Sequence, residues 1–366
     1  MAKIKIKRER VKFASDNVAG ACPEVLDAIL KANEGDSTPY GNDSISSELQ
    51  DKFSEIFEKE VIVFPTASGT AANALALSTM TPSYGNIYCH KMSHINTDEC
   101  GAPEFFSNGT KVQLVPGANG RMTPQGIETA VLKRTDLHFP KTRAVTLTQA
   151  TELGTLYQPA QLQAIHRVAK KHELKIHMDG ARFANAVAQL KVAPKEITWK
   201  AGVDILSFGC TKNGAPVGDA VVFFNHDLAH EFEWRCKQAG QLASKMRFIA
   251  APWVHLLRED AWLRHAAHAN KMAARLARGI NRIRGLKLMF PRQANGVFVE
   301  LPVAVIAALH RIGWHFYTFI GEGGARLMCS WDTTPEDVDD LLADLTELMA
   351  NRKKLPAPKP GQVQNH

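Results

Sequence analysis

Six consecutive residues, His177-Met178-Asp179-Gly180-Ala181-Arg182, carry the groups in this sequence that are best suited to chemistry. The apolar run before them predicts a buried parallel strand, and the amphipathic segment after them predicts a helix. Asp179 would then lie at the C-terminal end of the strand, with the guanidinium of Arg182 close behind. The segment 207–214 repeats this arrangement with Lys212. An acid, an arginine and a lysine at neighbouring strand ends are the groups that hold a pyridinium cofactor on a Schiff-base lysine.

Each of these side chains also has a simpler interpretation. Lys212 can form a Schiff base with an aldehyde if its strand end is dry, but a lysine in a surface loop fits the same sequence. Asp179 is costly at the end of a buried strand unless a cation lies beside it. That cation is either the ring nitrogen of the cofactor or the guanidinium of Arg182. The spacing from Asp179 to Lys212 spans one αβ unit, which favours the cofactor.

A group of small residues follows the predicted strand at 61–64. Ser68, Gly69 and Thr70 open a helix there, and the free N–H groups and positive dipole end of a helix start bind phosphate. Helix capping by Ser68 alone would explain the same residues. The segment matches neither the GxGxxG pattern of dinucleotide-binding proteins nor the GxxxxGK[ST] loop, which argues against both classes.

Histidines supply a fourth candidate group. The imidazole of His94 could stack on a pyridine ring and keep one nitrogen for proton transfer, and Glu99 lies close enough in the sequence to orient it. His90 with His94, or His265 with His268, could instead bind a metal. Neither pair has the third ligand and spacing of a zinc signature, so we expect no metal site. A histidine without a chemical role stays an alternative for His94.

The elements that must position these groups alternate along the first part of the chain. Strand-like segments at 61–64, 144–148, 174–178, 204–208 and 220–224 alternate with helix-like segments at 70–77, 159–172 and 182–190. This alternation predicts an α/β domain with a mostly parallel sheet and helices on both faces. Ligands bind outside the C-terminal strand ends of such sheets.

After about residue 252 the pattern predicts a smaller α+β domain. Its expected helices lie at 260–280 and 303–311, its expected strands at 286–290, 296–301, 315–320 and 326–330, and its last helix follows Thr334 as N-cap and Pro335 at N1. We therefore expect an N-terminal arm and large cofactor-binding domain over 1–255, a small domain over 256–351, and a flexible proline-rich tail over 352–366.

The net charge of +7 lies at the ends of the 366-residue chain. Residues 1–12 contribute +5 and residues 352–366 contribute +4, which leaves −2 for residues 13–351. Charge confined to the termini argues against a nucleic-acid-binding protein. No apolar run reaches the roughly 18 residues of a membrane span, and residues 1–8 lack the apolar core of a secretory signal. The 6 scattered cysteines predict reduced thiols and a cytoplasmic location.

Together these motifs resemble the pyridoxal 5′-phosphate-dependent threonine aldolases, which belong to the β-eliminating lyases of the aspartate-aminotransferase-like fold, fold type I. The resemblance covers about Phe13 to Met349 and rests on Ser15-Asp16-Asn17, Tyr40-Gly41-Asn42-Asp43, Ser68-Gly69-Thr70, His94 with Glu99, the block from Asp179 to Arg182, Thr211-Lys212 and Arg326. Segments 100–109, 199–210 and 238–248 resemble one bacterial branch of low-specificity L-threonine (phenylserine) aldolases.

The resemblance implies a role in cofactor binding for several residues. Lys212 would form the Schiff base, Asp179 would pair with the ring nitrogen, and His94 would stack on the ring. The phosphate would be held by small and hydroxyl-bearing residues, namely Ser68, Gly69, Thr70 and Thr211. Arg247 would reach the phosphate from a neighbouring subunit, since the family implies a homotetramer of dimers with active sites at the dimer interface.

The resemblance also implies a small amino-acid substrate. Arg182 and Arg326, with Ser15, would bind its carboxylate, because a bidentate guanidinium suits that planar anion. The expected reaction cleaves the Cα–Cβ bond of a β-hydroxy-L-amino acid, such as L-threonine, L-allo-threonine or phenylserine, to glycine and an aldehyde. A β-eliminating or transaminating enzyme on the same scaffold is the alternative, and the complete set of Lys212, Asp179 and Arg326 disfavours a catalytically inactive regulator.

One segment departs from the family pattern. Many relatives carry a second active-site histidine after the strand at 144–148, and this chain has Glu152 at that position. The base that removes the β-hydroxyl proton therefore stays open among His94 or a water that it holds, Glu99 and Glu152.

Overall fold

The computed structural model describes residues 10–320 and 323–356. The chain divides into two compact units, a large one over Gly20–Arg264 and a small one made of Met1–Ala19 with His265–His366. This division differs from the predicted one, because it falls after Arg264 rather than after residue 255 and groups the N-terminal segment with the C-terminal unit. Most of the predicted tail lies outside the described residues, and its first residues form a 3-10 turn, Arg352–Lys354.

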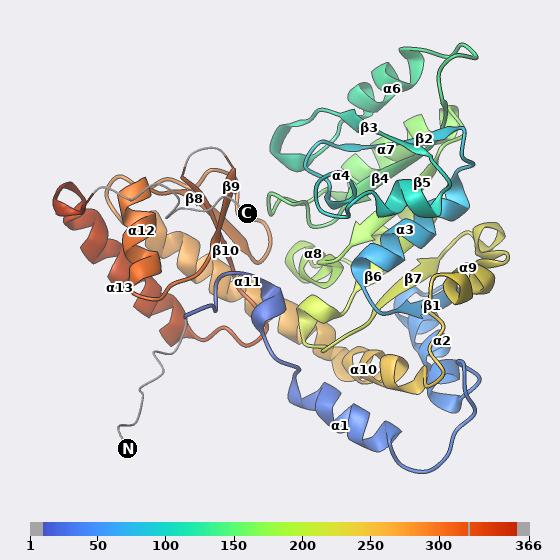
Figure 1. Cartoon of the computed structure of the whole chain (residues 1–366), viewed down its shortest axis with the longest axis horizontal. Helices are drawn as coiled ribbons and strands as arrows, with labels where there is room; N and C mark the ends of the chain where they lie inside the picture. The colour runs from blue at the N-terminus through green and yellow to red at the C-terminus, as the bar shows by residue number, and fades with distance from the viewer. Residues whose placement is uncertain (1–9, 321–322, 357–366) are drawn as a thin grey trace. The chain divides into compact units, whose positions relative to one another are not determined.

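The large unit is built on a 7-stranded sheet with the strand order β1-β7-β6-β5-β4-β2-β3 (Figure 1). Its strands are β1 (Ile62–Thr66), β2 (Gly85–His90), β3 (Lys111–Val115), β4 (Lys141–Thr148), β5 (Lys175–Gly180), β6 (Ile205–Gly209) and β7 (Asp219–Phe223). Strands β3, β2, β4, β5 and β6 pair in parallel, whereas β7 pairs antiparallel with both β6 and β1. The predicted mostly parallel sheet is confirmed, and β2 and β3 are strands that the pattern did not predict.

Helices cover both faces of this sheet. The α-helices of the large unit are α1 (Pro23–Ala32), α2 (Ser44–Phe57), α3 (Gly69–Met80), α4 (His94–Thr97), α5 (Ala102–Phe106), α6 (Pro124–Leu132), α7 (Pro159–Lys171), α8 (Phe183–Leu190), α9 (Phe232–Gln238) and α10 (Arg247–Leu257). Asn73 of α3 contacts Asp179 on one face. On the other face Phe208 of β6 packs at 4.9 to 5.9 Å against aromatic rings of α10, α8 and α2, which are Trp253, Phe183 and Phe53.

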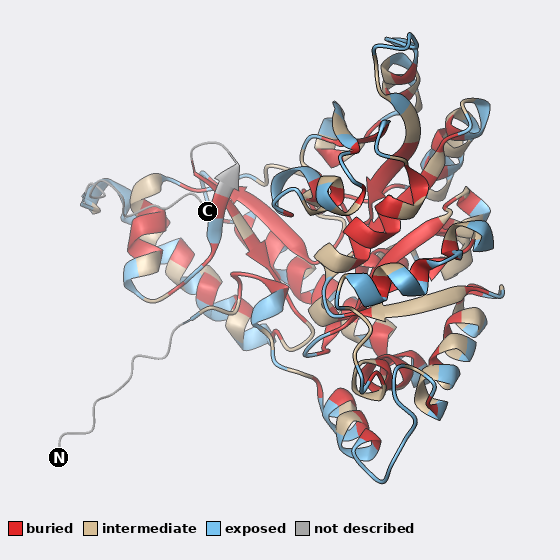
Figure 2. Cartoon of the chain, turned by 45° about the vertical axis from the view of Figure 1, so that its right-hand side comes forward, coloured by how far each residue is buried: buried red, intermediate tan, exposed pale blue. Residues whose placement is uncertain are grey.

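The strands near the site are therefore fixed from both sides. All residues of β6 and β7 are buried, whereas most of β1 at the sheet edge is half-buried (Figure 2). Near-continuous apolar burial is what the sequence runs at 204–208 and 220–224 predicted. A rigid strand end is a precise position for a catalytic side chain.

The small unit holds a 3-stranded antiparallel sheet in the order β8-β10-β9, with strands Gly296–Glu300, Gly324–Met328 and Tyr317–Ile320. Its helices are most of α11 (Ala261–Ile280), of which the first four residues are assigned to the large unit, with α12 (Val303–Arg311) and α13 (Pro335–Ala350). Thr334 caps α13 and Pro335 occupies its first turn, as predicted. The predicted strand at 286–290 is wrong, because only Leu288 forms a bridge there, with Val299.

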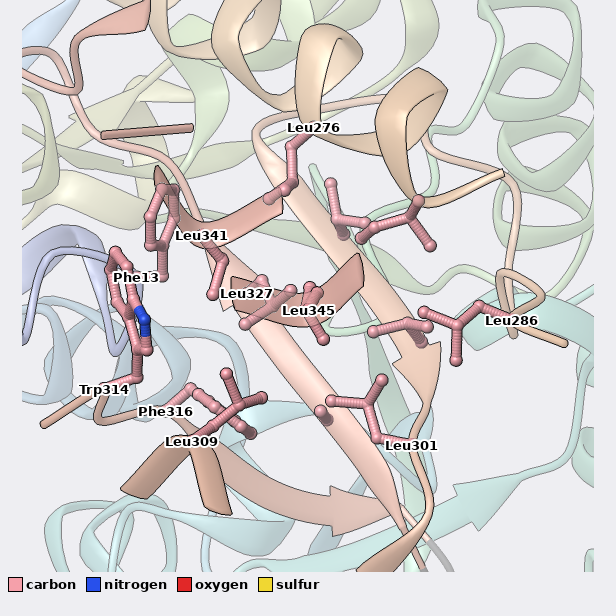
Figure 3. Packing of buried hydrophobic residues seen from close by; sticks show 14 of the residues in the cluster. Phe13, Leu276, Leu286, Leu301, Leu309, Trp314, Phe316, Leu327, Leu341 and Leu345 are labelled. Carbon is pink, nitrogen blue, oxygen red and sulfur yellow. The ribbon is translucent and has the colours of Figure 1, made fainter. Parts of the chain in front are cut away.

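The N-terminal segment belongs to the small unit because it completes the core of that unit. Phe13 is fully buried among Leu276, Trp314 and Leu327 (Figure 3). The backbone of Arg10 pairs with Trp314, and its guanidinium lies 2.7 Å from Asp344. Among the helices of the described residues, none is long and apolar enough to cross a membrane.

Candidate active site

The candidate residues of the large unit meet at one edge of the sheet. Ser68 follows β1, His94 follows β2 and Glu152 follows β4, while Asp179 lies within the end of β5 and Lys212 follows β6. These five strands run in the same direction, so their C-terminal ends share one edge. This is the edge at which sheets of this class bind ligands.

Asp179 is a buried carboxylate held by neutral donors. Its Oδ1 accepts a hydrogen bond from the N–H of Ala181 at 3.0 Å, and its Oδ2 accepts one from Asn73 Nδ2 at 3.3 Å. The side chain is 2% exposed and forms no ion pair with any residue that the structure describes. The alternative of a salt bridge to Arg182 is therefore not realised, and the charge of Asp179 stays available for a cationic partner.

Lys212 lies in a short 3-10 turn, Thr211–Asn213, directly after β6. The turn is anchored by Asn213, whose Nδ2 donates to the carbonyl of Trp262 at 2.8 Å. Within the described residues, no hydrogen-bond or ion-pair partner is found for the half-buried Lys212 amine. Its charge acts on three surrounding carboxyl groups, those of Glu99, Glu152 and Asp219.

The expected phosphate-binding residues lie at the start of α3 and beside the lysine turn. Ser68 is the N-cap of α3 and accepts from the N–H of Ala71, which confirms the capping interpretation. Gly69 is packed closely, since a Cβ atom there would lie 3.0 Å from Asp219 Oδ2. Thr70 is half-buried on the first turn, where helix N–H groups are free to bind an anion. Thr211 directs its hydroxyl to Asp219 at 3.2 Å.

Asp219 is a site residue that the sequence motifs did not reveal. Its Oδ1 accepts from the N–H of Cys210 at 2.8 Å and from the N–H of Thr211 at 3.3 Å, so it fixes the backbone just before Lys212. Burial raises the pKa of the Asp219 carboxyl, and the charge of Lys212 opposes that rise. Because β7 runs antiparallel, its first residue lies at the edge where the parallel strands end. An acid at the start of a fully buried strand is the sequence signal for it.

His94 opens α4 and is not oriented by Glu99. Its Nδ1 lies 3.5 Å from Asp98 Oδ2, whereas Glu99 Oε1 accepts a hydrogen bond from Asn73 Nδ2 at 2.9 Å. The expected contact between Glu99 and His94 is therefore wrong, because the short helix turns these neighbours in different directions. His90 uses both ring nitrogens locally, with the carbonyl of Gly117 and the N–H of Met92.

Glu152 joins this group of charges from the end of β4. It is half-buried, and burial together with the charge of Asp179 raises the pKa of its carboxyl. Three basic side chains oppose that rise: His94, Arg182 and Lys212. Glu152 thus faces the same space as the candidate residues of the neighbouring strand ends.

The other expected ligands lie elsewhere in the chain. Arg247 begins α10 and donates from Nε to the carbonyl of Ala32 at 2.9 Å. In the small unit, Ser15 is the buried N-cap of a short turn, and its Oγ accepts from the N–H of Asn17. The guanidinium of Arg326 on β10 lies over the ring of Tyr317 at 5.2 Å. The roles of these residues stay predictions.

The residues of the large unit fit a pyridoxal-phosphate cofactor. A buried carboxylate without an ion-pair partner among the described residues suits a protonated ring nitrogen. Lys212 supplies an amine for the aldehyde, and the start of α3 supplies N–H groups for the phosphate. The geometry therefore supports the expected cofactor.

Comparison with known proteins agrees with this site. The model of the β-eliminating lyase family matches residues 12–304. Low-specificity L-threonine aldolases from Pseudomonas aeruginosa and another Pseudomonas strain are 54% and 53% identical to the chain, over 92% and 93% of its length and 98% of their own. The structure of a threonine aldolase from Leishmania major has a TM-score of 0.87 at 28% identity and covers 93% of this chain and 99% of that one.

A more distant similarity supports the fold. A serine palmitoyltransferase from Sphingomonas wittichii is 20% identical with a TM-score of 0.70, which indicates a common fold and no more. Threonine aldolases and this enzyme share the fold type I architecture, so the predicted fold class is confirmed. The chain belongs to the β-eliminating lyase family and is a pyridoxal-phosphate-dependent lyase related to the threonine aldolases.

Proposed function

We propose that the protein is an aldolase that cleaves the Cα–Cβ bond of β-hydroxy-L-amino acids to glycine and an aldehyde, with L-threonine, L-allo-threonine and phenylserine as candidate substrates. The observation that carries the proposal is a buried carboxylate, Asp179, placed at the same sheet edge as Lys212 without an ion-pair partner among the described residues. The names of the closely similar Pseudomonas proteins support the same reaction.

When bound, pyridoxal phosphate supplies an electron sink for the pair of electrons left on Cα after bond cleavage. Asp179 would hold a proton on the ring nitrogen, because a buried carboxylate favours a cation at that position. Lys212 would hold the aldehyde carbon, and the N–H groups at the start of α3 would bind the phosphate with Ser68, Gly69, Thr70 and Thr211.

We propose that Arg182, Arg326 and Ser15 bind the substrate carboxylate and thereby orient the substrate. For Arg326 and Ser15, this proposal rests on the family resemblance. Arg182 forms the N-cap position of α8, directly after the strand that carries Asp179. A planar fork of N–H donors would fix the carboxylate and thereby the direction of the Cα–Cβ bond.

Removal of the β-hydroxyl proton is assigned first to His94 or a water that it holds. Glu152 is the second candidate, because it faces His94, Arg182 and Lys212 from the end of β4. Glu99 is the third. A base in this position gives about 10²- to 10⁴-fold in rate.

The oligomeric state of the enzyme and its location in the cell are also part of the proposal. A homotetramer of dimers, with Arg247 reaching the phosphate of a neighbouring subunit, rests on the family resemblance. A cytoplasmic location fits the free state of Cys22, Cys89, Cys100, Cys210, Cys236 and Cys329.

Product analysis tests the proposed reaction. The purified full-length enzyme with pyridoxal phosphate should convert L-threonine to glycine and acetaldehyde in equal amounts. Ammonia together with a keto acid would show β-elimination instead, and a keto acid without free ammonia would show transamination. Lys212→Ala should lose covalent cofactor absorbance and at least about 10³-fold in turnover. Wild-type activity in that variant would refute the scheme, and Lys271→Ala, a change on α11, is the control.

A further inference from the structure

Asn73 lies between two buried carboxyl groups. Its Nδ2 atom is 2.9 Å from Glu99 Oε1 and 3.3 Å from Asp179 Oδ2, so both amide hydrogens are donated to carboxyl oxygens. The three side chains come from separate parts of the large unit, and their exposed fractions are 2%, 3% and 2%. Two ionised carboxylates around one neutral amide in such a dry site would repel each other strongly.

Two further atoms of the Asn73 and Glu99 side chains indicate that Glu99 carries a proton. Asn73 Oδ1 and Glu99 Oε2 are buried, and neither has a hydrogen-bond partner in the described part of the chain. A proton on Glu99 Oε2 would give Asn73 Oδ1 the donor that it lacks, because a carboxylic acid and a primary amide can pair through two hydrogen bonds. One proton thus satisfies both atoms, whereas an ionised Glu99 satisfies neither.

The electrostatic surroundings of Glu99 favour the same state. Burial is the largest influence on its pKa, and the charges of Asp179 and Glu152 act in the same direction. The hydrogen bond from Asn73 and the charge of Lys212 oppose them and are outweighed. Together these influences raise the pKa of Glu99 to about 8. The acid form therefore predominates at neutral pH.

We propose that Glu99 is a neutral carboxylic acid paired with Asn73, and that this pair is a positioning element that leaves Asp179 as the charged carboxylate beside it. Asn73 then fixes Oδ2 of Asp179 while the N–H of Ala181 fixes Oδ1. Glu99 no longer qualifies as a general base near neutral pH. The role toward Asp179 rests on the proposed function, whereas the proton on Glu99 does not depend on it.

Infrared spectroscopy of the full-length holoenzyme tests the proton directly. A protonated carboxyl group has a C=O stretch separate from that of a carboxylate. In wild-type enzyme, we expect the protonated-carboxyl band of Glu99 to disappear between about pH 6 and about pH 10. In Glu99→Gln this change should be absent over the same range. Glu152→Gln is the matched control, because it removes another acid with a raised pKa and should keep the band of Glu99.

The partner of the proton is tested with Asn73→Leu, which has a similar volume and no amide. The Glu99 band should move to higher frequency in this variant, because its C=O loses the Asn73 donor. The apparent pKa of the bound cofactor, measured from its absorbance against pH, should shift by about one unit or more, because Asp179 loses the hydrogen-bond donor at Oδ2.

If the spectrum of wild type at about pH 6 contains no protonated-carboxyl band that Glu99→Gln removes, the proposal is overturned, because Glu99 is then already ionised at that pH. A Glu99 band that does not respond to Asn73→Leu would overturn the pairing. If that variant does not fold, the Glu99→Gln comparison still decides the protonation state. Failure of the threonine-cleavage assay would leave the infrared result standing, so the two proposals fail separately.

Discussion

The carboxylate of Asp219 accepts hydrogen bonds from both the backbone N–H and the hydroxyl of Thr211, at 3.3 and 3.2 Å. The same oxygen accepts from the N–H of Cys210 at 2.8 Å. The two residues before Lys212 are thus fixed by the first residue of the neighbouring strand β7. An antiparallel strand in the sheet brings an acid to the edge where the parallel strands end.

Replacement of Asp219 tests this anchor. Asp219→Ala should lower the free energy of unfolding by about 1–3 kcal/mol, because buried N–H groups of the lysine turn lose their acceptor. Asp219→Asn keeps an oxygen at that position and should lose less. Urea unfolding of the full-length protein measures both values. Equal losses for the two variants would show that the charge, and not the acceptor, matters at this position.

Asp179 should govern cofactor chemistry more than folding. Asp179→Asn retains the shape but removes the charge, so kcat should fall by about 10²- to 10³-fold while the unfolding midpoint changes little. Asp204→Asn is the control, because Asp204 also accepts hydrogen bonds from Ile176 and Asn225, at the opposite end of β6. Steady-state kinetics and thermal unfolding of both variants separate the two effects. A similar loss of kcat in both would contradict the assignment.

Stability should decrease as pH rises from about 4.5 to about 8 because of Glu99. Its pKa is raised by burial to about 8 in the folded protein, against 4.5 in a free side chain, so the folded state binds the proton more tightly than the unfolded chain. That contribution is complete below about pH 4.5 and is lost as pH rises through about 8. The loss amounts to a few kcal/mol at most. Thermal unfolding between about pH 6 and 9 should show a smaller decline in Glu99→Gln than in wild type, and equal declines would exclude Glu99 as the source.

His177 should produce the opposite dependence at acid pH. Burial lowers the pKa of its imidazole to about 4, and both ring nitrogens are occupied by Thr146 and Ser207 at 2.8 and 2.9 Å. The unfolded chain binds the proton more readily between about pH 4 and 6.5, so stability is lost as pH falls through this window, by up to about 3 kcal/mol. His177→Gln should flatten this slope in urea unfolding curves. A slope that stays unchanged would show that other groups cause it.

The sequence predicts best those site residues that follow strongly apolar strands. Asp179 lies near the end of β5 and Lys212 follows β6, and every residue of these two strands except Lys175 is buried. The strands β2 and β3 were not predicted. β3 lies at the sheet edge with mostly exposed or half-buried residues, and β2 carries Asn86, Tyr88 and His90 within a buried run. Their polar residues find partners only in the folded sheet.

Asn73 and Asp219 were not predicted from the sequence, for a related reason. Asn73 lies in the middle of an Ala- and Leu-rich helix, where a single amide is indistinguishable from an ordinary helix residue. Its function depends on Glu99 and Asp179, which are distant in the sequence. Asp98 and Glu99 are adjacent, and only the direction in which the chain turns after α4 decides that Asp98 meets His94.

The base for the β-hydroxyl proton can be identified by comparing His94 and Glu152. His94→Phe keeps an aromatic ring for stacking but removes the nitrogens, so kcat for L-threonine should fall by about 10²- to 10⁴-fold. Glu152→Gln should change the pH profile of kcat/KM with a smaller loss, because its carboxyl acts on the charges around His94. Asp98→Asn should have a modest effect, since Asp98 is largely exposed and lies 3.5 Å from His94. An unchanged kcat in His94→Phe together with a large loss in Glu152→Gln would transfer the role to Glu152.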